Sequence, residues 1–381
     1  MTVRSPVVVI APNSFKGSMS ATEAGAAIAA GVRRVWPDAE LRLCPIADGG
    51  EGTLDAVLSA GGERRTARVS AAAGAPVDAA YGLIANDTAI IESAQVVGLT
   101  DADATAHPVE GRSTRGLGEL IRILLDAGVR RLVVGLGGSS TNDGGAGLLA
   151  ALGLALFDSK GHSVEPTPAG LETLSRIDAS ALDARLAGTR ITILSDVDNP
   201  LCGKRGATAI FGPQKGVRPE SVPTIDARLE RFATLAEAAI GRSAKDLPGA
   251  GAAGGLGFAL LLAGGELRSG AEVVADLLGL DAALDDADWL ITGEGRTDRQ
   301  TLLGKAPLVA ARRAAAKRVP ATLVSGGIDR SALPELSRHF AGCHSIVFGP
   351  TTLEACVTDA AGLLADRAEQ LARLFEGAHR S

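Results

Sequence analysis

The sequence predicts an α/β protein of about two domains, and three observations support this prediction. Short β-branched, apolar segments alternate with segments of helical spacing, which is the pattern of a parallel sheet flanked by helices. The 381 residues leave room for two sizeable cores. The chain holds 48 glycines but only 3% aromatic residues, a composition that suits close helix–sheet packing and ligand loops lined by backbone.

The N-terminal part of the chain is expected to alternate strand, helix, strand and helix. Val7 to Ala11 is an apolar strand, and Ser20 to Val35 has apolar residues at helical spacing. Leu41 to Ile46 is predicted to be a second strand, and Thr53 to Ala60 a second helix. From Thr66 to Glu92, short alternating strands separated by turns are typical of antiparallel pairs.

Beyond residue 115 the pattern returns to single strands that alternate with helices. We expect a helix from Gly116 to Gly128 and a strand from Arg131 to Gly135. Further helices are predicted at 224–240, 271–278 and 308–318, and further strands at 191–195, 289–292, 321–325 and 344–348. Several of these strands end in glycine or an acidic residue. Because ligands favour the carboxyl ends of parallel strands, we expect the functional residues there.

Composition disfavours several classes of partner. The formal net charge is −6 and no basic tract is present, which argues against nucleic acid or an anionic membrane as partner. The four cysteines are isolated and no signal peptide is recognised, so we expect a cytoplasmic protein. The uncharged run Leu247 to Gly265 contains seven glycines, so it predicts a loop feeding a buried helix at 258–263 rather than a membrane span.

The most informative stretch is VVGLGGSSTNDGGAG, residues 133–147. A strand, a glycine-rich polar loop and an apolar helix follow one another, and bare N–H groups at a helix N-terminus favour an anion. The loop is neither GxxxxGK[ST] nor GxGxxG, so it indicates phosphate without naming the reaction, and a plain glycine-rich turn is the alternative. The candidate nucleotide-binding residues are Gly137, Gly138, Ser139, Thr141, Asn142 and Asp143.

Two carboxylates follow the strand at 191–195. Asp196 and Asp198 stand at alternate positions, so both point the same way if the chain is extended. One could hold Mg²⁺ while the other takes a proton, with Asp196 the catalytic candidate, or both could hold metal through water. A solvated acidic turn is the alternative. Lys215, in FGPQKG, is a candidate cation for nucleotide phosphates, with an exposed lysine as its alternative.

Candidate substrate-binding residues lie at other predicted strand ends. Lys16 stands beside Ser14 after the first strand, where it could meet a phosphate or a carboxylate, and it is a second catalytic candidate. Asp48 and Glu51 flank two glycines at a predicted helix N-terminus, where simple capping is the alternative. Two more candidates follow the strand at 289–292: Glu294 and Arg296. An arginine fork binds a carboxylate bidentately. The five histidines lie outside every motif, so we assign them no catalytic role.

These blocks resemble the bacterial glycerate kinase family, which includes enzymes of glyoxylate and glucarate breakdown. The matching stretches are collinear and cover nearly the whole chain. They are APNSFKGSMSA (11–21), ADGGEGT (47–53), IES and VGLT (within 91–100), STRGLGELI (113–121), GLGGSSTNDGGAG (135–147), SDVDNPLCG (195–203), GATAIFGPQKG (206–216), PGAGAAGGLG (248–257) and ITGEGRTDRQTLLGKAP (291–307). Two positions depart from the family pattern, with Asn13 in place of the usual Asp and Ser140 in place of the usual Ala.

The resemblance implies transfer of phosphate from ATP, with Mg²⁺, to D-glycerate at its 2-hydroxyl, giving 2-phosphoglycerate. The alternatives are phosphorylation at the 3-hydroxyl, giving 3-phosphoglycerate, or a kinase for another small hydroxy acid. The resemblance also implies a flavodoxin-like domain from both chain ends, 1–64 plus 285–381. An inserted α/β domain over 65–284, likened to restriction endonucleases, is implied as well. The oligomeric state, including a homo-oligomer, stays open.

Two other classes of function compete with a kinase. A dinucleotide-dependent oxidoreductase is disfavoured because no strict GxGxxG opens the first strand–helix unit and no histidine stands in a motif. A nucleotide-binding sensor without catalysis is disfavoured because so many polar residues gather in glycine loops. An assay for ATP-dependent phosphorylation separates both from a kinase.

Overall fold

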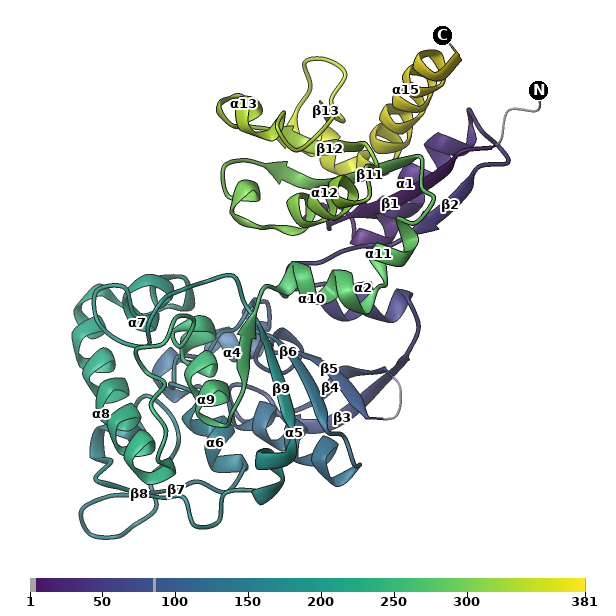
Figure 1. The fold of residues 1–381 in the computed structure, drawn as a ribbon. Coiled ribbons are helices and arrows are strands. Elements are labelled where there is room, and N and C mark those ends of the chain that lie inside the picture. The colour runs from purple at the N-terminus through teal and green to yellow at the C-terminus, as the bar shows by residue number, and fades with distance from the viewer. Residues whose placement is uncertain (1–4, 85–86, 381) are drawn as a thin grey trace. The chain divides into compact units, whose positions relative to one another are not determined.

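The computed structural model describes residues 5–84 and 87–380, which form two compact units (Figure 1). Unit 1 comprises Met1–Asp48, Asp55–Gly61 and Ala271–Ser381, and unit 2 comprises Gly49–Leu54 and Gly62–Gly270. Purple elements from the start of the chain and yellow-green elements from its end therefore belong to the same unit. The predicted α/β fold, with a parallel-sheet domain built from both chain ends, is confirmed.

Unit 1 is built on a five-stranded parallel sheet with the order β2-β1-β11-β12-β13. Its strands are β1 (Val7–Pro12), β2 (Glu40–Leu43), β11 (Trp289–Thr297), β12 (Ala321–Ile328) and β13 (Gly342–Ser345). Counted within the unit, this is the order 2-1-3-4-5 of flavodoxin-like folds. The strand order reverses between β1 and β11, and such folds bind ligands beyond the carboxyl ends of the strands at that point.

Helices α1 (Ala21–Arg33) and α15 (Ala360–Arg380) join the two chain ends of unit 1. α1 begins with a capping box, because the Ser20 hydroxyl accepts from the Glu23 N–H while the Glu23 carboxylate accepts from the Ser20 N–H. A Cβ at Gly31 would lie 2.0 Å from the Ala365 carbonyl oxygen, so the close contact of α1 with α15 requires glycine. The other helices are α12 (Ala306–Ala316), α11 (Leu280–Ala283), α13 (Leu333–Leu336) and α14 (Leu353–Thr358), with α2 (Thr53–Ser59) and α10 (Gly270–Leu277), whose first residues fall in unit 2.

Unit 2 is built on a six-stranded mixed sheet with the order β10-β9-β6-β5-β4-β3. Its strands are β3 (Glu63–Ser70), β4 (Pro76–Ile84), β5 (Thr88–Glu92), β6 (Arg131–Gly135), β9 (Arg190–Leu194) and β10 (Glu266–Arg268). The first three pair antiparallel and the last four pair parallel, which confirms the change of pattern predicted from the sequence. A separate two-stranded antiparallel sheet, β7 (Ala155–Phe157) with β8 (Arg176–Asp178), and the short strand β10 were not predicted.

The helices of unit 2 enclose a large aliphatic core. They are α3 (Ala94–Val97), α4 (Ala102–Ala106), α5 (Arg115–Asp126), α6 (Ala146–Ala151), α7 (Ala207–Phe211), α8 (Val222–Ile240) and α9 (Leu256–Leu262). Every residue of α9 is buried, which confirms the buried helix predicted for this apolar run. Within the described residues, no helix combines the length and the apolar character needed to cross a membrane.

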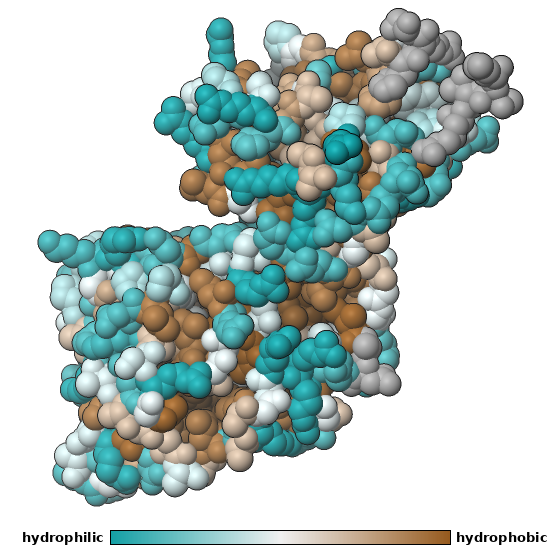
Figure 2. All heavy atoms as spheres, viewed as in Figure 1, coloured by the Kyte–Doolittle hydropathy of each residue, from teal (hydrophilic) through white to brown (hydrophobic). Residues whose placement is uncertain are grey.

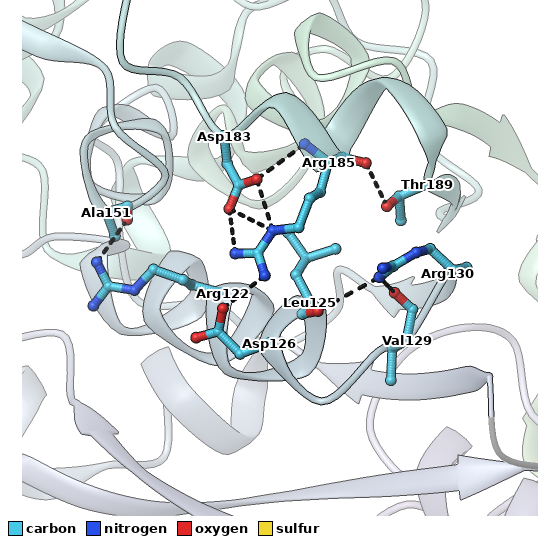
Figure 3. Close-up of polar contacts among 9 residues, drawn as sticks. All are labelled: Arg122, Leu125, Asp126, Val129, Arg130, Ala151, Asp183, Arg185 and Thr189. Atoms are coloured by element: carbon cyan, nitrogen blue, oxygen red, sulfur yellow. Dashed lines mark hydrogen bonds and ion pairs between the residues drawn. The ribbon is translucent and has the colours of Figure 1, made fainter.

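An ion-pair network fixes one edge of unit 2 (Figure 3). Arg185, in the 3₁₀ helix η3 (Ala184–Gly188), donates to Asp183 at 2.6 Å and to Asp126 at the end of α5 at 2.7 Å. Asp183 also caps η3 by accepting the Arg185 N–H. On the face drawn in Figure 2, hydrophilic residues surround smaller hydrophobic areas in each unit, as in ordinary globular proteins.

The domain boundaries at 64/65 and 284/285, which the resemblance implies, remain a prediction. Unit 1 already resumes at Ala271, and Arg313 of α12 forms ion pairs with Glu272 and Asp276 of α10, at 2.6 and 2.7 Å. Strands β2 and β13 also begin and end a few residues earlier than the apolar runs from which they were predicted.

Candidate active site

Unit 1 contains a cavity of about 1040 Å³ at the carboxyl ends of β1, β11, β12 and β13. This is the edge where the strand order reverses, so its position agrees with the general rule for open α/β sheets. The polar residues that line the cavity are Asn13, Ser14, Lys16, Ser18, Asp48, Glu294, Arg296, Asp298, Lys305, Asp329, Thr351 and Thr352. The structure thus brings five sequence-predicted substrate residues to one cavity: Ser14, Lys16, Asp48, Glu294 and Arg296.

The loop after β1 presents Lys16 because its neighbours anchor it. The Asn13 N–H donates to the Gly293 carbonyl at 2.8 Å, which holds the loop against the end of β11. Phe15 is buried in the core of unit 1, and its backbone N–H donates across a tight turn to the Met19 carbonyl. Lys16, between these anchors, is exposed and lines the cavity. A Cβ at Gly295 would lie 3.3 Å from the backbone nitrogen of Lys16, so the loop also lies close against the backbone of β11.

The cavity holds three cations and several acids. Lys16 follows β1, Arg296 lies near the end of β11, and Lys305 immediately precedes α12. Such a set can bind the carboxylate of a small acid or a phosphate group. Lys305, Asp298 and Asp329 were not singled out from the sequence, although Lys305 and Asp298 lie inside the stretch 291–307. An exposed lysine or aspartate has no periodic signature, and only the fold brings these side chains together.

Glu294 is the buried acid of this cavity, only 5% exposed. Its Oε1 accepts hydrogen bonds from the Thr301 hydroxyl at 2.6 Å and the Thr297 hydroxyl at 2.9 Å. Burial raises the pKa of the Glu294 carboxyl above its ordinary value, although these two hydroxyls and the charge of Lys305 oppose that shift. A carboxylate with a raised pKa in a cavity is a candidate for proton transfer.

In unit 2, the side chain of Lys215 contacts the predicted nucleotide loop. This lysine ends the 3₁₀ helix η4 (Pro213–Lys215) and is only 3% exposed. Its ammonium donates to the Ser139 hydroxyl at 3.0 Å and to the Thr141 carbonyl at 2.7 Å. Burial lowers the pKa of Lys215 to about 7, while the nearby charge of Asp143 opposes the shift. The alternative of an exposed lysine is therefore wrong.

Asp143 is engaged inside the loop itself. Its carboxylate accepts from the N–H and the hydroxyl of Thr114, both at 2.8 Å, and from the N–H groups of Gly145 and Gly147 at 3.0 and 3.1 Å. Asp143 is completely buried, and burial raises the pKa of its carboxyl, although the hydrogen bonds from these donors oppose that shift. Four internal hydrogen bonds give Asp143 a positioning role at the start of α6.

Other atoms of the glycine loops have no partner. Within the described residues, four buried side-chain polar atoms lack a hydrogen bond. Two of them, Thr141 Oγ1 and Asn142 Oδ1, belong to the predicted nucleotide loop, and a third, Thr53 Oγ1, lies at the start of α2, directly after the glycines of DGGEG. Buried polar groups are nearly always satisfied, so such atoms mark places where a ligand or water is expected. The structure thus leaves hydrogen-bonding capacity in the loop that the sequence analysis favoured.

The paired glycines of the sequence DGGEG have a structural use. A Cβ at Gly137 would lie 2.6 Å from the Cα of Gly50, and a Cβ at Gly135 would lie 2.6 Å from the Gly49 carbonyl oxygen. The group that approaches these glycines closely is therefore the backbone of a neighbouring loop. Asp48 lines the cavity of unit 1, whereas Glu51 is exposed and is not among the residues that line it.

Asp196 and Asp198 follow β9, whose Leu194 pairs with Gly135 at the end of β6. The two carboxylates therefore extend from the same edge of the sheet as the nucleotide loop. Both residues are exposed, and Asp198 forms an ion pair with Arg205 at 2.9 Å. Across residues 5–84 and 87–380, no three or more His, Cys, Asp or Glu side chains are grouped to hold a metal ion.

Arg112 is a buried residue that the sequence analysis missed. Only 3% exposed, it donates through Nη1 to the carbonyls of Ser140 and Lys215 at 2.9 and 3.1 Å. It therefore ties the polar loop to the segment that carries the buried lysine. Its position just before the stretch 113–121 gave no signal, because an arginine that binds only backbone carbonyls resembles any other arginine in sequence.

Comparison with known proteins agrees with these observations. The model of the Glycerate kinase family matches residues 8–376. The chain is 41% identical over 368 residues to the glycerate kinase of Bacillus subtilis, covering 96% of each chain. It is 42% identical over 324 residues to the glycerate 2-kinase of Escherichia coli, covering 84% of this chain and 85% of that one. A crystal structure from Salmonella typhimurium LT2, of a protein assigned as glycerate kinase 2, has a TM-score of 0.88 at 41% identity, with 99% and 100% of the chains covered.

Proposed function

The chain belongs to the glycerate kinase family, and we propose that it transfers the γ-phosphoryl group of ATP to the 2-hydroxyl of D-glycerate. The products are 2-phosphoglycerate and ADP. The name of the Escherichia coli relative favours the 2-hydroxyl over the 3-hydroxyl. The observation that supports this function most is the cavity of unit 1, where three cations stand beside a buried carboxylate.

On the acceptor side, Lys16 and Arg296 bind the carboxylate of D-glycerate. The acceptor is a small anion, and a guanidinium fork matches a carboxylate bidentately. Ser14, Asp48 and Glu294 are then available for its two hydroxyl groups, since all three line the same cavity. Glycerol, which lacks the carboxylate, is expected to be a very poor substrate.

On the donor side, the loop over residues 137–142 and Lys215 hold the phosphates of ATP. The glycine backbone offers N–H groups, and Lys215 offers a cation held by Ser139 and Thr141. The unpartnered oxygens of Thr141 and Asn142 support this assignment. Asp143 and Arg112 keep the loop in place through their internal bonds.

Mg²⁺ accompanies ATP in this proposal, and Asp196 and Asp198 are the residues that would hold it. Exposed carboxylate oxygens at the sheet edge fit a metal that keeps several waters and takes its other ligands from phosphate. When bound, the metal neutralises charge on the phosphates during transfer.

We also infer a cytoplasmic enzyme, because ATP is its donor and its cysteines are spaced as in proteins of reducing compartments. A role in glyoxylate metabolism remains a prediction.

ADP release, measured by a coupled assay with purified protein, tests the activity. We expect release with D-glycerate and Mg-ATP, little with glycerol, and none after chelation of the metal. Equal rates with and without D-glycerate would contradict the proposal.

A further inference from the structure

Glu294 has one carboxylate oxygen fixed and one available. Oε1 receives both hydroxyl hydrogen bonds, from Thr297 and from Thr301. Oε2 makes no hydrogen bond within the described residues, yet it is not among their buried unpartnered atoms. Since Glu294 lines the cavity, Oε2 is the oxygen that reaches it. The side chain is therefore held at one atom and presents the other to a ligand.

The other acids of the cavity are placed differently. Asp48 and Asp298 are partly exposed and Asp329 is exposed, whereas Glu294 is 5% exposed. Asp298 and Asp329 each accept a backbone N–H two residues ahead, a local turn contact. Among the carboxylates that line the cavity, Glu294 is thus the one that is both desolvated and fixed by two side-chain hydroxyls.

The hydroxyls that hold Glu294 are themselves fixed. The Thr297 hydroxyl is 2.7 Å from the Ser325 hydroxyl of β12, and Thr297, Thr301 and Ser325 are all completely buried. This chain of hydroxyls links β11, β12 and the turn before α12. Its members do not reach the cavity lining, so we regard them as positioning residues.

We propose that Glu294 is the proton acceptor for the 2-hydroxyl of D-glycerate, an inference that rests on the proposed function. As the glycerate O2–P bond forms, the bond between the γ-phosphorus and the β–γ bridging oxygen breaks, and its electron pair leaves with ADP. The O2 proton passes to Glu294 Oε2. No oxidant or further reactant is needed. This assigns to Glu294 the proton transfer that the sequence analysis left open at Asp196.

Several charges face Glu294 and set its titration. Burial raises the pKa of its carboxyl and the charge of Asp48 adds to this, while Thr301, Thr297 and the charge of Lys305 lower it. Five more ionisable groups line the same cavity: Lys16, Arg296, Asp298, Asp329 and Cys356. A base must be ionised, so kcat should fall as the pH drops through the pKa of Glu294 in the substrate complex. That dependence gives a second readout besides the rate.

The first test is E294Q, which keeps the size of the side chain and removes the base. We expect kcat to fall by about two to four orders of magnitude, with the KM for D-glycerate within roughly threefold of wild type. A kcat close to that of wild type would overturn the inference while the proposed function stands. If the wild type itself does not phosphorylate D-glycerate, the proposed function fails and this inference with it.

The second test does not depend on the folding of E294Q. In T301V one hydrogen bond to the charged form of Glu294 is lost, so its pKa rises and the acid limb of kcat should move to higher pH by roughly half to one unit. The matched control is T292V, because Thr292 is a buried threonine of β11, the strand that carries Glu294, and its hydroxyl donates to the Ala11 carbonyl at 2.6 Å. An acid limb that moves equally in both variants, or in neither, would contradict the role of Glu294.

Discussion

Arg296 is the side chain that should distinguish glycerate from glycerol. It lies exposed near the end of β11 and lines the unit 1 cavity with Lys16. A charge-assisted hydrogen bond is typically worth about 1.5–3 kcal/mol. R296M should therefore raise the KM for D-glycerate by roughly tenfold to a hundredfold and change the KM for ATP little. The variant should also discriminate less against glycerol.

Steady-state kinetics with each substrate varied in turn check this expectation. R299M is the matched control, because Arg299 is an exposed arginine three residues away that is not among the residues lining the cavity. It should leave both KM values near those of wild type. A weaker KM for ATP in R296M, with D-glycerate unaffected, would mean that the cavity of unit 1 holds the nucleotide.

Lys215 should couple nucleotide binding to proton uptake. Burial holds its pKa at about 7, so near neutral pH it is only partly charged. A bound phosphate favours the charged form and raises that pKa, so binding takes up a proton. The affinity for ADP should weaken by up to roughly tenfold as the pH rises from about 7 to about 8.

Calorimetric titration with ADP in buffers of different ionisation enthalpy measures this uptake directly. K215M supplies the comparison, because it removes the titrating group while keeping much of the side chain's volume. The uptake seen with wild type should disappear in K215M. Equal proton uptake by the two proteins would exclude Lys215 as the phosphate cation.

At the scale of elements, Asp183 and Arg185 fix η3 to the end of α5 (Figure 3). The hydrogen bonds from Arg185 lower the pKa of Asp183, so its charged form stabilises the fold. That contribution is present above the carboxyl's ordinary pKa of about 4 and is lost as the pH falls through the lowered value. D183N should lower the stability by about 1 kcal/mol near neutral pH, or about 2–4 °C in Tm.

Thermal unfolding followed by circular dichroism at a series of pH values measures this difference, which should shrink toward acid. D178N is a useful control, because Asp178 caps a local turn on β8 and is not part of the Arg185 network. A difference between D183N and wild type that stays constant down to strongly acid pH would contradict the assignment.

The elements most predictable from sequence were those that one periodicity determines. The apolar run of β1, the helical spacing of apolar residues in α1 and the buried α9 need only local information. The three-residue strand β10 could not be predicted, because Glu266, Leu267 and Arg268 become a strand only through pairing with β9. Two adjacent glycines in DGGEG are typical of a backbone that another group approaches closely, but whether that group is a ligand or another backbone depends on contacts distant in sequence.

At the scale of the whole molecule, the activity was more predictable than the site. Collinear motifs along nearly the entire chain point to one family, and the family model confirms it over residues 8–376. Which motif residues line the cavity was harder to predict from the sequence. Asp48 and Glu51 stand three residues apart, yet only Asp48 lines the cavity of unit 1. The burial of Lys215 and the hydrogen bonds of Arg112 to backbone carbonyls became evident only in the folded structure.

The position of the new phosphate tests the central claim most directly. After incubation with D-glycerate and Mg-ATP, the product is examined by phosphorus NMR and then treated with enolase alone. We expect the resonance of 2-phosphoglycerate and direct conversion to phosphoenolpyruvate. A product that reaches phosphoenolpyruvate only after phosphoglycerate mutase is added would be 3-phosphoglycerate and would contradict transfer to the 2-hydroxyl.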